Sequence, residues 1–417
     1  MVLVMGRHSA ACAQVPAQVP ARDGGLGRDD PVSSCFAMRI LHISDCYLPR
    51  LGGIETQVHD LARRQRAVGH DVEVITATPR ARHDRTAHEV IDGVPLHRTT
   101  ADLPFELPVH PRPGREVRGV LAARGRFDVV HLHAGVVSPF VFGALPTVVD
   151  AGLPLVITVH SLWGPAAPAF RVLDAVGRWS RWPVVFTAVS EVAAEPLRRI
   201  VGPGVPVGVL PNGIDETVWR PEPLPRDTDD VVIVAVMRLA PRKRPMPLLR
   251  ILRTVRQRVP ADVRLRAMIV GNGPELGGME RWLSRRGMDG WVELTGRLDR
   301  EALRDVYRRA DVFVAPARLE SFGIAALEAR TAGLPVVAMA GAGIREFVRP
   351  GVEGFLADDD AGMASSLTRL VVDPSLRAGI SAHNRQVLPE MTWPRVLRRC
   401  DEFYELAGSH PGLRGHS

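Results

Sequence analysis

The sequence predicts an α/β fold in which two doubly wound domains each carry a parallel sheet. From residue 38 onwards, short runs rich in Val and Ile alternate with longer amphipathic segments, which is the rhythm of strand–helix–strand units. The 417 residues suffice for two or three domains that each bury a core. A polar, proline-rich stretch at 219–230 interrupts the rhythm and reads as a linker. We therefore predict domains at 38–218 and 231–392.

The first half contains five short apolar runs whose Val and Ile content suits strands buried on both faces of a sheet. These expected strands are Ile40–Ile43, Val72–Thr76, Val129–Leu132, Val156–Val159 and Val184–Val189. Amphipathic segments at 55–68 and 136–149 predict helices between them. Residues 77–114 are rich in Pro, Gly, His and Arg, and predict irregular or hairpin structure.

The same alternation restarts after the linker. Expected strands lie at 231–236, 265–270, 292–294, 312–315 and 336–338, and expected helices at 246–258, 279–286, 301–310 and about 323–332. A last helix at 393–406 is expected to begin a C-terminal segment, 393–417, that packs back on the first domain. Residues 1–37 lack both a basic start and a long apolar stretch, so they do not indicate a secretory signal. Rich in Ala, Pro, Gly and Asp, they are expected to be a disordered leader or to precede the true start site.

Composition limits the classes of partner. The net charge of +7 and the pI near 10.0 favour anionic partners, among them nucleotide phosphates, anionic lipid surfaces and nucleic acid. No apolar stretch is long enough to cross a bilayer. The four cysteines show no spacing typical of a zinc site or a disulfide framework, which fits a reducing cytoplasm.

Lys243 is the only lysine among 53 Lys and Arg residues, and it follows the expected strand at 231–236. A lysine is a compact charge that reaches a single phosphate oxygen, whereas arginine is a wide planar fork. Arg238 lies in the same loop, so two cations could hold a diphosphate at this strand end. The alternative is that one lysine survived by chance in an arginine-rich chain. Arg242 and Arg244 are expected to form a solvated basic edge.

A second motif runs from Glu320 to Glu328, after the expected strand at 312–315. Ser321, Phe322, Gly323 and Ile324 would open a helix whose backbone N–H groups can bind a diphosphate. Glu320 could then contact a sugar ring, and Glu328 could accept hydrogen bonds from ribose hydroxyls. The alternative is a pair of solvated helix carboxylates.

Glycines and a histidine follow other expected strands. Gly53 allows close backbone approach to a ligand, with a tight turn as the alternative. Gly271 and Gly273 form an incomplete glycine motif, which could be a nucleotide-binding turn or only a tight strand-to-helix turn. Leu298 could line a base pocket through backbone groups. His160 ends the strand at 156–159 and is expected to point into the cleft between the domains.

Two acidic strings could suggest a metal. Asp227 and Asp229 fall in the linker, and residues 358–360 are likewise read as surface polarity. We predict no metal requirement.

Taken together and in this order, these residues resemble the retaining enzymes of glycosyltransferase family 4. The resemblance rests on Gly52-Gly53, His160, Pro211-Asn-Gly-Ile-Asp215, Arg238 with Lys243, Gly271 with Gly273, and Glu320-Ser-Phe-Gly with Glu328. It spans residues 38–407 and implies a GT-B fold, with a nucleotide-sugar donor bound mainly by the second domain and an acceptor bound mainly by the first. The family's glycine-glycine-proline-glutamate turn is replaced by residues 342–346, which leaves the place of Arg345 open.

The resemblance also implies roles for single residues. Arg238 and Lys243 would contact the donor diphosphate, Glu320 the sugar hydroxyls and Glu328 the ribose. His160 would lie near the reacting sugar, and Gly53 would approach the phosphates from the other domain. The implied chemistry is metal-independent transfer with retention of configuration, and no cofactor beyond the nucleotide-sugar co-substrate.

We therefore expect a cytoplasmic hexosyltransferase, with mannosyl as one candidate group, that uses a UDP- or GDP-sugar and a lipid, glycan or small-molecule acceptor. The alternatives are a sugar-nucleotide epimerase on the same fold and a non-catalytic sugar-nucleotide binding protein. Arg63, Arg64 and Arg66 raise the hypothesis of peripheral contact with an anionic membrane at its inner face, against a solvated helix face. No nucleic-acid partner is expected.

Overall fold

The computed structural model describes residues 37–50, 52–79, 88–99, 110–164, 167–177, 179–220, 222 and 229–410. The predicted leader lies outside the described residues except for Ala37. So do most of the predicted linker and the last seven residues of the chain. All that follows concerns the described residues.

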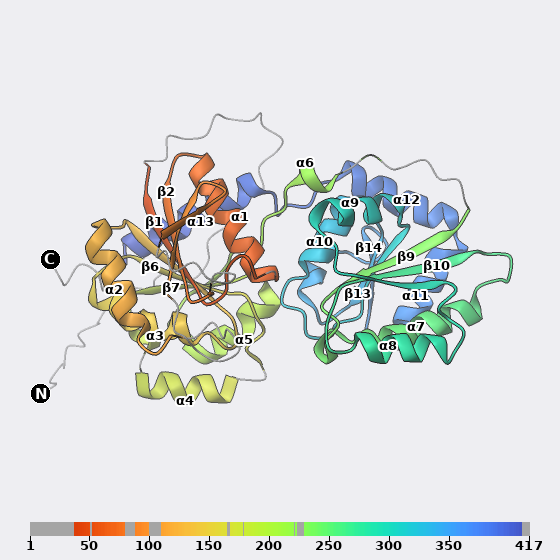
Figure 1. Ribbon diagram of the computed structural model, residues 1–417, viewed down its shortest axis with the longest axis horizontal. Coiled ribbons are helices and arrows are strands. Elements are labelled where there is room, and N and C mark those ends of the chain that lie inside the picture. Colours follow the sequence, from red (N-terminus) through yellow and green to blue (C-terminus); the bar gives the residue numbers. More distant parts are fainter. Residues whose placement is uncertain are drawn as a thin grey trace, which may run out of the picture. The chain divides into compact units, whose positions relative to one another are not determined.

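The first sheet has eight strands in the order β3-β4-β2-β1-β5-β6-β7-β8. All neighbours are parallel except β3 and β4, which form a hairpin within 77–114, where irregular or hairpin structure was expected. The order places β1 beside both β2 and β5, so the chain winds outward in two directions from β1 (Figure 1). The strands are β1 (Arg39–Ser44), β2 (Asp71–Thr76), β3 (His88–Ile91), β4 (Val94–Arg98), β5 (Val129–Ala134), β6 (Leu155–Val159), β7 (Val184–Ala188) and β8 (Val207–Val209).

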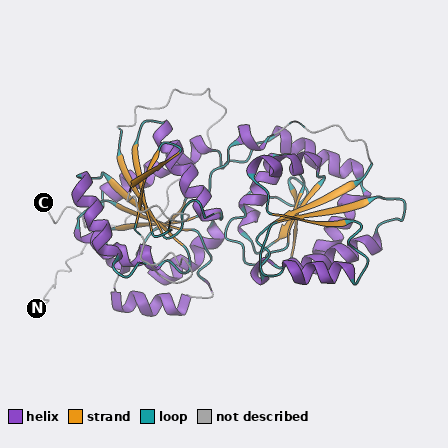
Figure 2. Ribbon diagram, viewed as in Figure 1, coloured by secondary structure: helices purple, strands orange, loops and turns teal. Residues whose placement is uncertain are grey.

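Helices connect these strands and cover the sheet, as Figure 2 shows. They are α1 (Gly53–Ala67), α2 (Pro113–Arg124), α3 (Pro139–Asp150), α4 (Ala167–Gly177), α5 (Glu191–Val201) and α6 (Glu216–Trp219). Helix α5 was not predicted, because Pro196 in its interior normally signals a break. Strand β8 was also missed, because three residues centred on a glycine give no periodicity.

The second sheet has six strands, all parallel, in the order β11-β10-β9-β12-β13-β14. They are β9 (Val231–Val236), β10 (Leu265–Val270), β11 (Val292–Gly296), β12 (Val312–Ala315), β13 (Val336–Met339) and β14 (Gly354–Ala357). Strand β9 is central and pairs with β10 and β12. The loops that follow β9 and β12 therefore leave the sheet side by side at its carboxyl edge.

The helices of this half are α7 (Pro245–Arg258), α8 (Leu276–Ser284), α9 (Arg300–Arg309), α10 (Ile324–Thr331), α11 (Asp360–Val372) and α12 (Pro374–Gln386). Helices α11 and α12 were not predicted, although both begin at a typical N-cap. Asp359 accepts a hydrogen bond from the Gly362 N–H group, and Asp373 accepts one from the Leu376 N–H group. The α/β class with two Rossmann-like sheets is confirmed.

The final helix, α13 (Trp393–Gly408), packs against the first sheet. Its residues Trp393, Cys400 and Tyr404 are buried in one hydrophobic cluster with Val156 of β6 and Val185 of β7. The Tyr404 hydroxyl also bonds side chains of the first half of the chain. Within the described ranges, no helix is long and apolar enough to cross a membrane.

Candidate active site

Lys243 and Glu320 form an ion pair at the carboxyl edge of the second sheet. Lys243 ends a short 3₁₀ helix after β9, and Glu320 lies in the loop after β12. Because β9 and β12 are neighbours, the fold brings these distant residues together. Both side chains keep about a fifth of their surface exposed, at 24% and 17%. The pair is thus close enough to solvent to meet a ligand.

Arg238 lies in the same loop as Lys243 and is exposed. Its charge reaches Glu55 at the start of α1: burial raises the pKa of that carboxyl, and the charges of Arg50 and Arg238 partly offset the rise. Arg238 therefore lies where the loop after β9 faces the first helix of the other sheet. This position is compatible with a phosphate ligand.

The turn before α10 depends on glycine. Gly323 caps the helix with φ of +94°, a backbone conformation that glycine adopts without strain. Phe322 is 1% exposed and packs on Phe347, so only its backbone is available to a ligand. The first N–H groups of a helix have no partner within it. The N–H group of Ile324, the first residue of α10, is therefore free of an intrahelical partner and lies in the same turn as Glu320.

Glu328 lies on the second turn of α10, and burial raises its pKa to about 8. Arg300 and the hydroxyl of Tyr307 work against that rise, and Asp60 adds to it. Glu328, Arg300 and Asp60 line one cavity, in which Arg300 donates a 2.8 Å hydrogen bond to Asp60. Sequence reasoning found Glu328 but missed Tyr307, Arg300 and Asp60, because Tyr, Arg and Asp are common in amphipathic helices without any function.

Gly271 and Gly273 are explained by backbone packing. A Cβ on Gly271, whose φ is +143°, would lie 1.8 Å from the Met237 carbonyl oxygen, and a Cβ on Gly273 would lie 2.3 Å from that of Leu239. Both contacts are with the loop that carries Arg238. The glycines therefore let the loop after β10 lie directly against the loop that carries Arg238.

The two other predicted ligand contacts are at loop ends. A Cβ on Gly53 would lie 3.3 Å from the Ile324 side chain, so the start of α1 lies against the start of α10. Leu298 follows β11, is half-buried, and packs against the larger hydrophobic core. No contact places Leu298 beside the Lys243–Glu320 pair.

His160 follows β6 and meets the loop of Glu320. The Ser321 hydroxyl donates a 2.7 Å hydrogen bond to the His160 carbonyl oxygen. The His160 Nε2 atom lies 3.0 Å from Nδ1 of His133. Burial lowers the pKa of His160 to about 4, so the ring is neutral near pH 7. His160, Ser321, Glu320 and Lys243 thus lie along one continuous series of loops.

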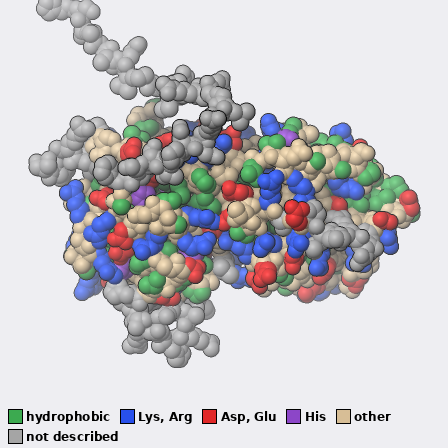
Figure 3. Space-filling view, turned by 90° about the horizontal axis from the view of Figure 1, so that it is seen from above, with side chains coloured by type: hydrophobic (Ala, Val, Ile, Leu, Met, Phe, Trp, Pro, Cys, Tyr) green, Lys and Arg blue, Asp and Glu red, His purple; other side chains and the backbone are tan. Residues whose placement is uncertain are grey.

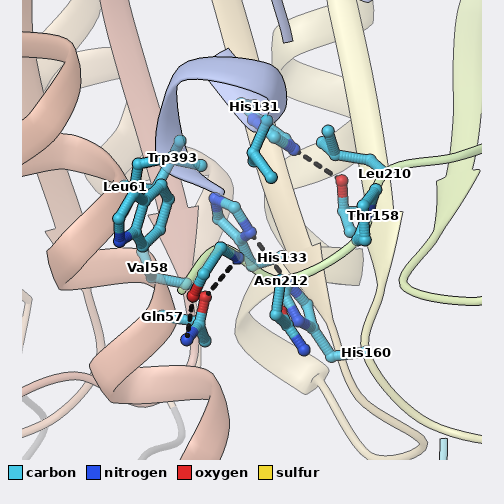
Figure 4. Close-up of a pocket in the computed structure, with 13 residues that line it drawn as sticks. Gln57, Val58, Leu61, His131, His133, Thr158, His160, Leu210, Asn212 and Trp393 are labelled. Carbon is cyan, nitrogen blue, oxygen red and sulfur yellow. Dashed lines mark hydrogen bonds between the residues drawn. The ribbon is translucent and has the colours of Figure 1, made fainter. Parts of the chain in front are cut away.

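Three further histidines, His42, His131 and His133, form a buried cluster next to His160. Figure 4 shows His131 and His133 of this cluster together with His160. Among the described residues, these three are the group of possible metal ligands whose ring nitrogens lie close enough together to bind one ion. Every ring nitrogen of the three already has a hydrogen-bond partner within the protein. Sequence reasoning missed this cluster. The signal was His131-Leu132-His133 on a strand, because alternate residues of a strand share a face.

Arg244 corrects one expectation. It was read as part of a solvated edge, but only 16% of its side chain is exposed. It donates to both carboxylate oxygens of Asp360 at 2.8 Å and to the Pro316 carbonyl oxygen at 3.0 Å. Arg244 ties the loop after β9 to the start of α11, and Asp360 is its partner. Arg345, whose place was open, is exposed.

Comparison with known proteins gives the family. Residues 51–218 match the family model described as Glycosyltransferase Family 4, and residues 219–387 match the one described as Glycosyl transferases group 1. D-inositol 3-phosphate glycosyltransferase of Thermobispora bispora is 30% identical over 395 residues, which cover 85% of this chain and 89% of that protein. The chain belongs to glycosyltransferase family 4.

Other relatives and structures agree. Phosphatidyl-myo-inositol mannosyltransferase of Mycolicibacterium smegmatis is 29% identical over 370 residues, covering 85% of this glycosyltransferase and 90% of the relative. Anabaena HepE, solved with UDP and glucose, has a TM-score of 0.66 at 19% identity and covers 88% and 99% of the two chains. Sucrose-phosphate synthase of Thermosynechococcus elongatus has a TM-score of 0.70 at 20% identity, covering 88% and 98%. The GT-B fold and the glycosyltransferase class are confirmed.

Proposed function

We propose that this glycosyltransferase moves a hexosyl group from a UDP- or GDP-sugar to a hydroxyl of an inositol phosphate, with retention of configuration and without a metal ion. The observation that carries the proposal is the Lys243–Glu320 ion pair beside the N-terminus of α10. One cation, one carboxylate and a row of backbone N–H groups there match a diphosphate that is joined to a sugar.

A bound donor diphosphate would replace Glu320 as the ion-pair partner of Lys243. In the structure the charge of Lys243 is paired with Glu320. When a sugar diphosphate binds, Lys243 and Arg238 would hold its phosphate oxygens, and the Glu320 carboxylate would accept hydrogen bonds from sugar hydroxyls. The two cations would then offset the negative charge that develops on the leaving phosphate.

The bond changes balance without a covalent enzyme intermediate. The bond between the anomeric carbon and the diphosphate oxygen breaks, and the acceptor oxygen bonds to the same carbon from the same face. The acceptor's hydroxyl proton passes to the leaving phosphate oxygen. No side chain needs to act as nucleophile, so the residues named here bind, orient and stabilise charge.

The acceptor class rests on relatives. Those compared above are an inositol 3-phosphate glycosyltransferase and a phosphatidyl-myo-inositol mannosyltransferase. Free and lipid-linked inositol share one chemistry, a ring of hydroxyls with a phosphate. We propose that the acceptor is free inositol phosphate and not its lipid-linked form, and that the enzyme is cytoplasmic.

Contact with an anionic membrane loses its main support, because the three arginines of α1 pair within the protein. Arg63 lies 3.6 Å from Asp60, Arg66 lies 3.2 Å from Asp71, and Arg64 pairs with Asp215. On the face drawn in Figure 3, basic side chains are interspersed with acidic ones.

A transfer assay tests the proposal. The purified chain is incubated with each UDP- or GDP-hexose and inositol phosphate in the presence of EDTA, and the anomeric configuration of the product is read by NMR. We expect one donor to give a product of retained configuration. Donor consumed without acceptor would favour the epimerase, and loss of activity in EDTA would contradict metal independence. Donor binding without turnover for any acceptor would favour the non-catalytic binding protein.

A further inference from the structure

A line of buried hydrogen bonds runs inward from His160. Its Nε2 atom lies 3.0 Å from His133 Nδ1, and His133 Nε2 lies 2.9 Å from His42 Nδ1. His42 Nε2 lies 2.7 Å from the Gln65 carbonyl oxygen Oε1. The side chains of His42, His133 and Gln65 are buried away from solvent. His133 and His42 each bond one neighbour through Nδ1 and the next through Nε2, whereas His160 joins the line through Nε2 alone.

The line continues through α13 and ends at the backbone. The Gln65 amide donates to the Tyr404 hydroxyl at 2.8 Å. The remaining steps join Tyr404 Oη to His131 Nδ1 at 2.9 Å, His131 Nε2 to Thr158 Oγ1 at 2.7 Å, Thr158 to Thr187 at 2.7 Å, and the Thr187 hydroxyl to the Ile157 carbonyl oxygen at 3.2 Å. Figure 4 draws the His131–Thr158 and His133–His160 steps.

The last acceptor gives the line a direction. A carbonyl oxygen can only accept, so Thr187 donates to Ile157 and must accept from Thr158. A neutral imidazole has one donor and one acceptor nitrogen. Once Thr158 is the donor to Thr187, each of the four histidine rings in turn must donate through Nε2, and the last of them is His160. Burial lowers the pKa of His42, His131 and His133, which keeps these rings neutral. Reversing the line would require turning over the Gln65 amide and would lose the Thr187–Ile157 bond.

We propose that this line of bonds holds His160 as the neutral tautomer protonated at Nε2, so that its Nδ1 atom meets the bound sugar or acceptor only as an acceptor of a hydroxyl hydrogen bond. The inference rests on the proposed function for the identity of the ligand. His160 lines a cavity and is partly exposed, and no described residue hydrogen-bonds its Nδ1 atom. His133, His42 and Tyr404 act through His160 and are positioning residues.

The tautomer can be read directly. The full chain is labelled with ¹⁵N-histidine, and the ring resonances of His160 are assigned by their loss in a His160→Gln variant. Long-range proton–nitrogen correlation then tells which nitrogen carries the proton. The test variant is Tyr404→Phe, which keeps the ring but removes the hydroxyl that joins Gln65 to His131. Tyr47→Phe is the matched control, because Tyr47 is also buried and bonds a histidine, His59, outside the line.

We expect the wild-type protein and Tyr47→Phe to carry the His160 proton on Nε2 alone. Tyr404→Phe should populate both tautomers of His160. Its kcat/KM should then fall in proportion to the fraction of His160 that stays protonated at Nε2. If Tyr404→Phe does not fold, Thr187→Val removes the hydroxyl that sets the direction and should give the same change in tautomer.

Three results would overturn the inference. The first is a wild-type His160 protonated at Nδ1, and the second is a tautomer that neither Tyr404→Phe nor Thr187→Val changes. The third is stoichiometric Zn²⁺ held by His42, His131 and His133, because an ion there would replace the hydrogen bonds. Failure of the proposed function would look different: the tautomers would behave as stated, but no donor would be turned over.

Discussion

At the scale of single residues, Lys243 links the sequence to the proposed chemistry. Its ammonium group pairs with Glu320, and we propose that a donor diphosphate replaces that partner. Replacing Lys243 with Ala should lower kcat by at least ~100-fold, because a charge aimed at the leaving group is lost. Steady-state kinetics with the preferred donor measure this. Arg242→Ala is the control, since the neighbouring Arg242 is exposed, and equal rates for Lys243→Ala and wild type would remove Lys243 from the mechanism.

Glu328 gives a pH-dependent prediction. Its pKa rises on folding from 4.5 to about 8, so the folded state binds the proton more tightly than the unfolded state does. The stability that this proton contributes is fully present below pH 4.5 and is lost as the pH rises towards 8. Urea unfolding from pH 5 to pH 8 should therefore show wild type losing stability relative to Glu328→Gln. Parallel curves for the two proteins would contradict the raised pKa.

Glu328 should also report on donor binding. A carboxyl that is protonated in the free protein must lose its proton to accept two ribose hydroxyls as a carboxylate. Nucleotide binding at pH 7 should therefore release a proton. Calorimetry in buffers of different ionisation enthalpy measures the number released, and Glu328→Gln should release none. Equal proton release by both proteins would place the ionisation elsewhere.

At the scale of elements, the loops at the carboxyl edge depend on glycine. Gly271→Ala should destabilise the fold, because the new Cβ would strike the Met237 carbonyl oxygen and φ is +143°. Gly278→Ala is the matched control: Gly278 lies within α8, and its Cβ would meet nothing within 4 Å. There alanine should stabilise by about 0.5–1 kcal/mol. Thermal melting compares the two, and a neutral Gly271→Ala would contradict the loop packing.

Much of the element pattern could be read from the sequence. Buried parallel strands such as β1 and β9 are nearly continuous in Val, Ile and Leu, which makes them visible without structural information. Strand β14 was missed because it is short, begins at a glycine and is only half-buried along its length. The sequence left Gly271 open between a nucleotide-binding turn and a tight strand-to-helix turn, and the fold shows it packed on the loop of Arg238.

At the scale of the whole molecule, long-range pairings decide what could be predicted. Lys243 and Glu320 could be placed together because both follow strands of one parallel sheet. The line of hydrogen bonds behind His160 could not, because it joins His42, Gln65, His131 and Tyr404, the last from a helix that returns to the first sheet. No local sequence pattern indicates that these four side chains meet.

Charge pairing predicts the behaviour towards membranes. Because Arg63, Arg64 and Arg66 are paired with aspartates, we expect the chain to partition equally to neutral and anionic vesicles. Vesicle sedimentation at physiological salt measures this. Clear preference for anionic vesicles would favour lipid-linked inositol phosphate as the acceptor instead of free inositol phosphate.

The measurement that tests the central claim most directly is calorimetric titration of the purified chain with UDP, GDP, ADP and their sugar conjugates in EDTA, repeated with Lys243→Ala. We expect one nucleotide family to bind without a metal, and its sugar conjugate to bind more weakly to Lys243→Ala. No binding of any nucleotide by the wild-type chain, or binding that Lys243→Ala leaves unchanged, would contradict a donor diphosphate held at the Lys243–Glu320 pair.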